Sequence, residues 1–306
     1  MIGFKLSQFT KHILKDAWSN FKASVSAEKR ALGYKGQFRG VFPGFEYETV
    51  FEDKFDNRLN REAWGYAQPW GDFHPGGIHQ YYDNDGTLSY VAPEGLILEL
   101  RNIPKTWKKN ELPEWRRDSR LPEEFTIPTG VGYVHSKQTW QYGWFEAWIK
   151  LPKGQSYWPA FWLVGENTWP PEIDILEGYS HKGPLYDENT LFGKFRKRPN
   201  RKIQPNLHYG VVEDGTKDDY GAYDIPVADA TERFVQYACL WEEDRIEIYY
   251  DGIRVFQCTD PEILKWFNKE NAQQRIILNH GLHENYPENP HESAMIVRKV
   301  KVMQRR

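Results

Sequence analysis

The chain of 306 residues is long enough for one large all-β domain or two small ones, and for a sizeable core. Its net charge of -3 predicts no general affinity for polyanions. Aromatic residues make up 16% of the chain and include 13 Trp, which together with many Gly and Pro is typical of a β-sandwich that stacks sugar rings on indole faces.

The first 45 residues are predicted to form an extension ahead of the β domain. Residues 7–25 have the pattern of an amphipathic helix, which Ser7 can cap. Its apolar residues recur every four positions, at Phe9, Ile13, Ala17, Phe21 and Val25. Because the first 30 residues hold six Lys or Arg against two acids, this helix could contact a membrane or an assembly partner. Packing on the sandwich, or a role as a tether, is the alternative.

Strand patterns begin at Tyr47 and predict a domain that spans residues 46–306. Short β-rich runs bounded by Asn, Asp, Gly and Pro predict strands over 50–55, 80–83, 88–91 and 95–100. Residues 102–128 show no clear period and contain four Pro, so they are either a functional loop or a surface excursion. In the first case Trp107 and Trp115 would make a lid or a sugar platform.

Alternation along residues 143–150 predicts a strand with one apolar face. Phe145, Ala147 and Ile149 face the core in this pattern, which leaves Trp144 on the face that lines a cleft or solvent. In the next predicted strand Trp158 and Trp162 are four residues apart, so they share a face.

The segment from Trp169 to Gly178, W-P-P-E-I-D-I-L-E-G, carries three carboxylates among aliphatic residues. A strand of period two places Glu172 and Asp174 on one face and sends Glu177 to the other. One extra residue at Ile175–Leu176, accommodated as a β-bulge, would return Glu177 to the side of Glu172. We therefore predict that all three acids point into one space.

Carboxylates packed on one sheet face repel, so at least one is expected to keep its proton to higher pH. Two carboxyls of unequal pKa suit glycoside hydrolysis, in which one attacks the anomeric carbon and the other protonates the leaving oxygen. Same-face neighbours on a strand lie roughly 6 to 7 Å apart at Cα. With converging side chains, this favours the ~5 to 5.5 Å carboxyl separation of a retaining mechanism. A calcium site or a solvated strand face is the alternative.

Residues 194–202, K-F-R-K-R-P-N-R-K, carry six positive charges, including Arg196. This basic run is either a solvated loop or a recognition element for sulfate, carboxylate or acyl-acid groups, because Arg pairs well with such oxyanions. Nucleic acid is disfavoured as a partner, since the basic run stands alone in a chain of negative net charge.

The two cysteines, Cys239 and Cys258, fall on the first and third strands of a predicted meander. Its strands cover 234–241, 245–250 and 253–258. Because each strand of a meander pairs with the next, the two cysteines are not neighbours and we expect no disulfide.

Further motifs surround the acidic strand: G-W-F-E at 143–146, L-P-K-G at 151–154 and W-P-A-F-W-L at 158–163. Together with the E-x-D-x-x-E of the acidic strand, they resemble glycoside hydrolase family 16, the retaining endo-β-glycanases and transglycosylases that include laminarinases, lichenases, agarases and carrageenases. The resemblance covers roughly residues 46–304. It implies an all-β fold, a β-jelly-roll sandwich of two antiparallel sheets with a concave, Trp-lined substrate cleft, preceded by the helical extension.

The resemblance also implies catalytic roles. Glu172 would be the nucleophile, Asp174 would assist it, and Glu177 would act as acid and then as base in a retaining endo-hydrolase. No cofactor is expected. Many relatives carry acids of a structural calcium site where this chain has Lys54 and Arg298, so we expect no metal either.

The predicted substrate contacts come partly from the resemblance and partly from the residue patterns. Trp158, Trp162 and Trp169 match cleft aromatics of the family. His208, in L-H-Y-G, matches a polar position near the leaving-group side, or is an ordinary structural His. The patterns add Trp144 from the strand parity and Arg196 from the basic run.

The motifs indicate the chemistry and leave the polymer open. A β-1,3 or mixed-linkage glucan or a β-galactan is expected, and the basic run favours an anionic polysaccharide, such as a sulfated galactan or an acidic bacterial exopolysaccharide. A transglycosylase is one alternative activity. A non-catalytic carbohydrate-binding protein on the same scaffold is another, although relatives of that kind lack one or both catalytic Glu.

A polysaccharide substrate predicts an extracellular or particle-associated protein, whose oligomeric state the sequence does not indicate. The first 20 residues contain no secretory h-region, since charged residues interrupt every apolar run. A removed leader or another export route would reconcile the two. No stretch of the chain approaches the roughly 18 apolar residues of a membrane span.

Overall fold

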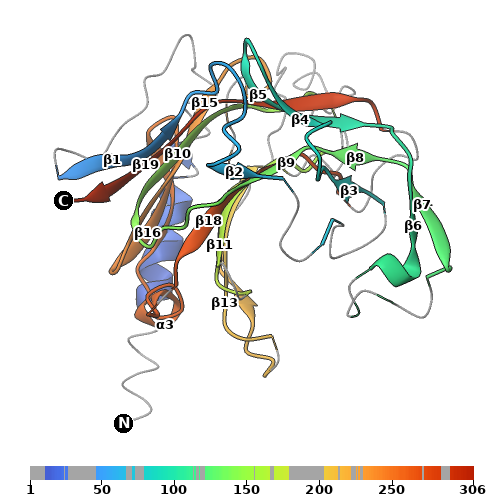
Figure 1. The fold of residues 1–306 in the computed structure, drawn as a ribbon. Helices are drawn as coiled ribbons and strands as arrows, with labels where there is room; N and C mark the ends of the chain where they lie inside the picture. Colours follow the sequence, from blue (N-terminus) through green and yellow to red (C-terminus); the bar gives the residue numbers. More distant parts are fainter. Residues whose placement is uncertain are drawn as a thin grey trace, which may run out of the picture.

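The computed structural model describes residues 11–23, 25–26, 46–66, 71–72, 79–112, 114, 117, 121–154, 156–165, 169–178, 203–212, 214–221, 225, 227, 230–270, 272–283 and 290–306. Within them, two large sheets form a β-jelly-roll sandwich beside an N-terminal helix (Figure 1). The predicted fold class is confirmed.

The ten-stranded sheet contains the predicted strands of the first part of the chain and the predicted meander. Its order is β17 (Ile253–Cys258), β16 (Arg245–Tyr250), β15 (Val235–Glu242), β10 (Gly143–Lys150), β19 (Ser293–Arg305), β5 (Gly95–Arg101), β8 (Gly130–Val131) and β3 (Tyr81–Tyr82), with β1 (Tyr47–Asp53) also on β19 and β4 (Ser89–Ala92) also on β5. All its pairs are antiparallel except β3 with β8, which are parallel. This one pair departs from the expected antiparallel sheet.

The seven-stranded sheet carries the acidic segment near its centre. Its order is β14 (Asp218–Asp219), β13 (Ile203–Tyr209), β12 (Glu172–Gly178), β11 (Ala160–Gly165), β18 (Gln274–Asn279), β9 (Tyr133–Ser136) and β2 (Trp64–Gly65). All its pairs are antiparallel. A strand at this position is hydrogen-bonded to a neighbour on each side, so its backbone is rigid and positions its side chains precisely.

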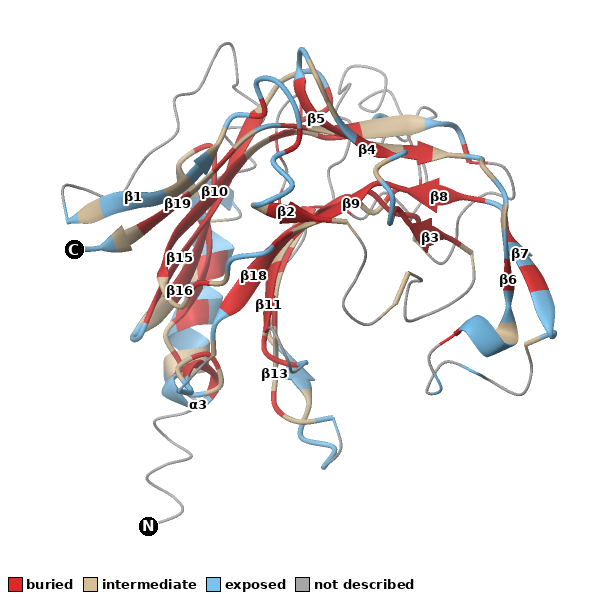
Figure 2. Cartoon of the chain, viewed as in Figure 1, coloured by how far each residue is buried: buried red, intermediate tan, exposed pale blue. Residues whose placement is uncertain are grey.

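The core lies between the two sheets and comes from alternate residues of each strand. On β10, Phe145, Ala147 and Ile149 point into it, as the alternation predicted. On β12, Ile173 and Leu176 do the same. Figure 2 shows the continuous burial of the central strands of both sheets. Because the apolar side chains of β12 point into the core, its carboxylates point to the opposite face of the seven-stranded sheet, which we call the acidic face.

The predicted loop at 102–128 contains a hairpin of β6 (Lys105–Lys108) and β7 (Glu124–Ile127), with a 3₁₀ turn at Lys109–Glu111. The indole of Trp107 is buried in a small cluster with Tyr81 and Phe125, so it is not an exposed platform. Trp115 lies outside the described residues. Figure 1 shows this hairpin as an arm that extends away from the sandwich.

The N-terminal helix is confirmed over residues 11–23 and 25–26, and it packs against β17 at the edge of the ten-stranded sheet. Its buried residues are Asp16 and Asn20, while Phe21 and Val25 of the expected apolar face are exposed. The helix therefore docks through polar side chains. None of the described helices has the length and apolar content that a membrane crossing requires.

Cys239 and Cys258 are both free and buried. Cys239 pairs with Ile248 and Cys258 with Ile246, so β16 lies between the two cysteines. The absence of a disulfide between them is confirmed, and its reason is the meander order.

Candidate active site

The acidic strand β12 has the bulge that the sequence predicts. Against β11, Leu176 pairs with Phe161 and Asp174 with Trp162, so Ile175 has no partner of its own. Against β13, the register also shifts between Asp174 and Glu177. This extra residue restores Glu177 to the side of Glu172 and Asp174. The three carboxylates share the acidic face.

Side chains directly opposite one another on neighbouring strands share a face, so the register identifies the neighbours of each acid. Glu172 lies between His208 and Val164, Asp174 between Asn206 and Trp162, and Glu177 between Gln204 and Ala160. One strand farther, Ala160 pairs with Asn279. Sequence reasoning missed the three amides, although Gln204, Asn206 and His208 alternate in Q-P-N-L-H, which is the signal of a polar strand face.

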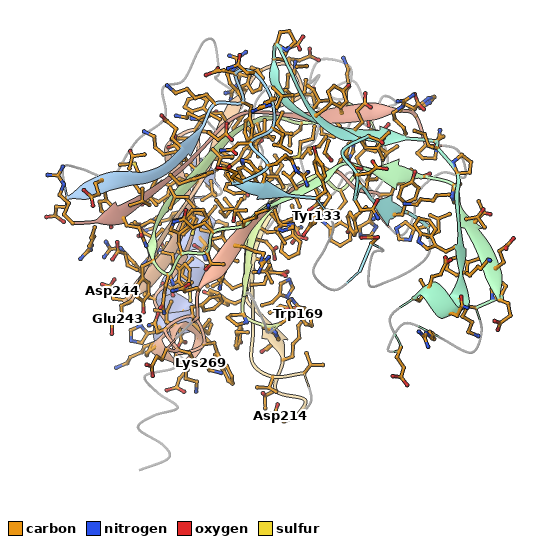
Figure 3. The ribbon with its side chains drawn as sticks, viewed as in Figure 1. Tyr133, Trp169, Asp214, Glu243, Asp244 and Lys269 are labelled. Carbon is orange, nitrogen blue, oxygen red and sulfur yellow. The ribbon has the colours of Figure 1, made fainter. Side chains whose placement is uncertain are left out.

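Three indoles predicted as cleft aromatics lie at this face and hold its polar groups. Trp169 Nε1 donates to Glu172 Oε2 at 3.0 Å, and Trp158 Nε1 donates to Glu177 Oε1 at 3.0 Å. Trp162 Nε1 donates to Asn279 Oδ1 at 2.8 Å. Trp169 is 47% exposed and lies near the ends of β11 and β13, whereas Tyr133 lies deeper (Figure 3). An exposed ring beside a carboxylate is suited to stacking on a sugar.

His208 lies beside two of the acids. Its Nε2 lies 3.4 Å from Glu172 Oε1 and 3.1 Å from Asp174 Oδ2. Its Nδ1 lies 2.5 Å from Asp219 Oδ1, which also accepts from Lys217 Nζ at 2.5 Å. Asp219 thereby fixes the ring with Nε2 directed at the carboxylates. Sequence reasoning missed Lys217 and Asp219, although Asp214–Gly215 is a turn signal just before them.

The environment of the carboxylates favours their neutral forms. Burial first, and then the charge of Asp174, raise the pKa of Glu172 well above its ordinary value, while His208 and Trp169 lower it. Burial, followed by the charges of Glu177 and Asp219, raises the pKa of Asp174 well above its ordinary value. The expectation that at least one acid keeps its proton to higher pH is confirmed in direction.

The sequence profile of glycosyl hydrolases family 16 matches residues 84–279, from the turn before β4 to the end of β18. The chain belongs to glycosyl hydrolases family 16. It is similar to the endo-1,3-1,4-beta-glycanase EglC of Rhizobium meliloti, with 30% identity over 45% of this chain and 25% of that protein. It is also similar to a glucan endo-1,3-beta-glucosidase of Cryptopygus antarcticus, with 26% identity over 66% of this chain and 65% of that protein.

The family 16 fold also agrees with a solved structure. The crystal structure of LamAcat from Zobellia galactanivorans superimposes with a TM-score of 0.64 at 20% identity, over 84% of this chain and 97% of that one. At this identity the likeness concerns the fold alone. The chain spans 25% of the length of the Rhizobium meliloti protein and 65% of the length of the Cryptopygus antarcticus protein.

Trp144 does not line the family 16 cleft, so that prediction is wrong. The parity argument is correct, since Trp144 is opposite to the core-facing side chains of β10. However, β10 belongs to the ten-stranded sheet, whose outer face is remote from the acids of β12. There Trp144 is 2% exposed, packed on Leu240, Met303 and Tyr249. Period two indicates a face but not which of two sheets a strand joins.

Two further sequence predictions concern basic residues. Arg196 and the basic run at 194–202 lie outside the described residues. Lys54 pairs with Glu52 at 3.7 Å, and the Arg298 guanidinium lies 3.9 Å from the ring centroid of Phe234. Cationic side chains thus occupy both positions for which the sequence predicted the loss of a structural calcium site.

One group of side chains has the geometry for a cation. Single ligand atoms from Glu172, Asp174 and His208 lie within 4.8 Å of one another. One imidazole with two carboxylates is a donor set that zinc accepts. Glu172 and Asp174 are two of the three acids that the sequence predicts to be catalytic, so a bound cation would compete with substrate for Glu172.

Replacing Asp174 by Asn is expected to stabilise the fold at neutral pH by roughly 1 to 3 kcal/mol, because the folded site disfavours the ionised form that an unfolded Asp174 adopts freely, and an amide avoids that cost. The folded-state pKa of Asp174 is raised above the unfolded value. The contribution of this carboxyl to stability is therefore fully present below about pH 4 and is lost as the pH rises through the folded-state pKa. Urea unfolding midpoints measured across this range should show a stability difference that grows with pH.

The matched control for this experiment is Asp244→Asn, because Asp244 is exposed in the turn between β15 and β16. Its unfolding midpoint should follow that of the wild type at every pH. An Asp174→Asn variant that is less stable than the wild type at neutral pH would show that the fold stabilises the ionised carboxylate, which contradicts a raised pKa.

Proposed function

We propose that this family 16 protein is a retaining endo-β-glycan hydrolase that cleaves internal bonds of a polysaccharide by double displacement. The observation that carries the proposal is the bulge of β12, which brings Glu172 and Glu177 to one face on either side of Asp174. Each of the two Glu accepts an indole N–H, so one oxygen of each carboxyl is oriented. Two oriented carboxyls with a third acid between them fit a nucleophile and a separate acid.

In the first step, Glu172 attacks the anomeric carbon while Glu177 donates a proton to the leaving oxygen. The bond between the anomeric carbon and that oxygen breaks, and a covalent glycosyl ester forms on Glu172. In the second step, Glu177 removes a proton from water, which attacks the same carbon and releases Glu172. The configuration of the anomeric carbon is retained because it is inverted twice.

Asp174 and His208 support the nucleophile in this proposal. Asp174 shares a side-chain hydrogen bond with Glu172, and His208 Nε2 faces both groups. A hydrogen bond between two carboxyl groups contains one proton, so a proton held by Asp174 leaves Glu172 ionised for the attack. The interaction with His208 lowers the pKa of Glu172, which favours the ionised nucleophile before attack.

The proposed substrate is a β-1,3 or mixed-linkage glucan, or a β-galactan. The activities of the two relatives named above, an endo-1,3-1,4-beta-glycanase and a glucan endo-1,3-beta-glucosidase, support a glucan. An anionic polysaccharide is the second candidate. It is supported by the six positive charges of residues 194–202 in the sequence, because Arg and Lys pair well with sulfate and carboxylate oxygens.

The test is a panel of polymers: neutral β-glucans, agar-type and carrageenan-type galactans, and acidic bacterial exopolysaccharides. New reducing ends and a ladder of oligosaccharides from one polymer would support endo-hydrolysis. The products should be the same with EDTA present, because the proposed steps use carboxyl groups alone. Products longer than the substrate on addition of an acceptor sugar would indicate a transglycosylase. Binding without cleavage across the whole panel would contradict the proposal in favour of a carbohydrate-binding protein.

A further inference from the structure

The outward face of the N-terminal helix is apolar on one side and basic on the other. Four side chains form an apolar stripe: Leu14, Trp18, Phe21 and Val25, which are 63%, 59%, 52% and 39% exposed. With 3.6 residues per turn, they lie within about 60° of Trp18 on one side. On the other side of Trp18, over a similar arc of about 60°, is a row of exposed lysines: Lys11, Lys15 and Lys22.

The docking of the helix keeps this face turned outward. On the inward side, the Asn20 amide donates to the Gln257 carbonyl at 3.2 Å and accepts from the Gln257 N–H at 2.8 Å. The Asp16 carboxylate accepts from the Thr259 N–H at 2.7 Å. Rotation of the helix to bury the stripe against the sandwich would break these bonds and leave buried polar groups without partners. The stripe is therefore exposed as a consequence of specific contacts.

The basic side of the helix borders a groove. It has a volume of about 560 Å³ and lies between the helix and strands β16 and β17. The charged side chains that line the groove are Lys15, Lys22 and Arg254, and the indole of Trp18 forms part of the wall of the groove. Arg254 is paired with Glu247 at 2.8 Å, so the net positive charge of the groove comes from the two lysines. Lys22 Nζ also lies 5.1 Å from the Trp18 ring centroid.

We propose that the helix is a peripheral membrane anchor that lays its outward face on a lipid surface with anionic head groups. Aliphatic side chains such as Leu14 and Val25 offer nothing to a sugar hydroxyl, but they can enter the boundary between head groups and acyl chains. The lysines complement phosphate oxygens beside that boundary. Within residues 11–23 and 25–26 the only acid is Asp16, on the inward side, so no described helix residue opposes an anionic surface.

The proposed anchor leaves the acidic face accessible. The helix is bonded to β17 of the ten-stranded sheet, whereas the carboxylates lie on the outer face of the seven-stranded sheet. A single short helix gives reversible binding that depends on both the apolar and the charged contributions. The anchor would hold a polysaccharide-cleaving domain at a membrane surface without a change at its site.

The test is co-sedimentation of the full chain with vesicles of phosphatidylcholine alone and of equal parts phosphatidylcholine and phosphatidylglycerol. We expect binding to the second and little to the first, and weaker binding as salt screens the lysines. The double variant Trp18→Ser/Phe21→Ser should lower the partition coefficient at least about tenfold, and Lys15→Gln/Lys22→Gln should lower it about tenfold or more.

Two control variants change matched residues elsewhere: Val50→Ser removes an exposed apolar side chain on β1, and Lys108→Gln removes an exposed lysine on β6. Both should bind vesicles as the wild type does. Failure of the wild type to bind anionic vesicles at low salt would overturn the proposal. Equal vesicle binding by the wild type and the Trp18→Ser/Phe21→Ser variant would also overturn it. So would a dimer of the wild type in solution that this variant dissociates, because a second copy of the chain would then cover the stripe.

Discussion

Replacing Glu172 by Ser is expected to lower kcat on the polymer by about 10⁴-fold or more, because no other group on the acidic face is placed to form the glycosyl ester. Glu177→Gln should lower it by about 10²- to 10⁴-fold, since it removes proton transfer to the leaving oxygen. Both variants should remain folded and should still bind the polymer, because the indoles and the strand register are unchanged. The measurement is the rate of reducing-end formation.

Aryl glycosides separate the two roles. A dinitrophenolate leaves without a proton, so Glu177→Gln should form the glycosyl ester at nearly the wild-type rate and then accumulate it. Added azide should speed its turnover, because azide attacks without a base. Glu172→Ser should instead give a product of inverted configuration with azide. The reverse pattern in the two variants would exchange the two roles. The control is Glu124→Gln, which changes an exposed carboxylate on β7 and should have wild-type kinetics.

Replacing Glu146 by Ala is expected to lower the free energy of unfolding by about 3 to 5 kcal/mol. Glu146 is fully buried on the outer face of the ten-stranded sheet, and its Oε1 lies 2.8 Å from Lys299 Nζ. Its carboxylate also accepts from Trp144 Nε1 at 3.0 Å and from Gln236 Nε2 at 2.8 Å. The variant removes the acceptor shared by the Lys299 ammonium and three N–H donors, the third being Trp148 Nε1 at 3.3 Å. Chemical denaturation measures the difference.

An exposed ion pair of the same length gives the comparison. Lys265 Nζ and Glu262 Oε2 are also 2.8 Å apart, but their side chains are 54% and 58% exposed, against 19% and 0% for Lys299 and Glu146. Glu262→Ala should cost only about 0 to 1 kcal/mol, because water screens the pair and replaces the lost contact. Equal losses in the two variants would show that burial does not decide the stability of the Glu146 network.

The conformation of the acidic strand could be predicted from the sequence because one local constraint determines it. Three acids can share one face of β12 only if one residue is added between Asp174 and Glu177, and the bulge lies there. The place of His208 beside Glu172 could not be derived in this way. It depends on the register between β12 and β13, which are separated by more than twenty residues, and no local pattern sets that register.

The burial of Trp144 away from the cleft and the exposure of Phe21 have a common physical cause. Trp144 lies on a face whose cover comes from distant strands, and Phe21 lies on a helix that is held by hydrogen bonds to a sheet edge. Periodicity reports which side chains share a side of an element. Which side is then buried depends on tertiary contacts, and a polar side with well-placed acceptors can be the one that is buried.

The contact between the helix and β17 also bears on how the protein avoids self-association. An edge strand presents unpaired N–H and C=O groups that another chain can extend. Asn20 binds both groups of Gln257, as a neighbouring strand would, and Asp16 binds the next outward N–H, at Thr259. The helix therefore covers the edge of the sheet at Gln257 and Thr259. A chain that lost this helix would carry an open template for strand addition, and its first defect would be aggregation with a site still intact.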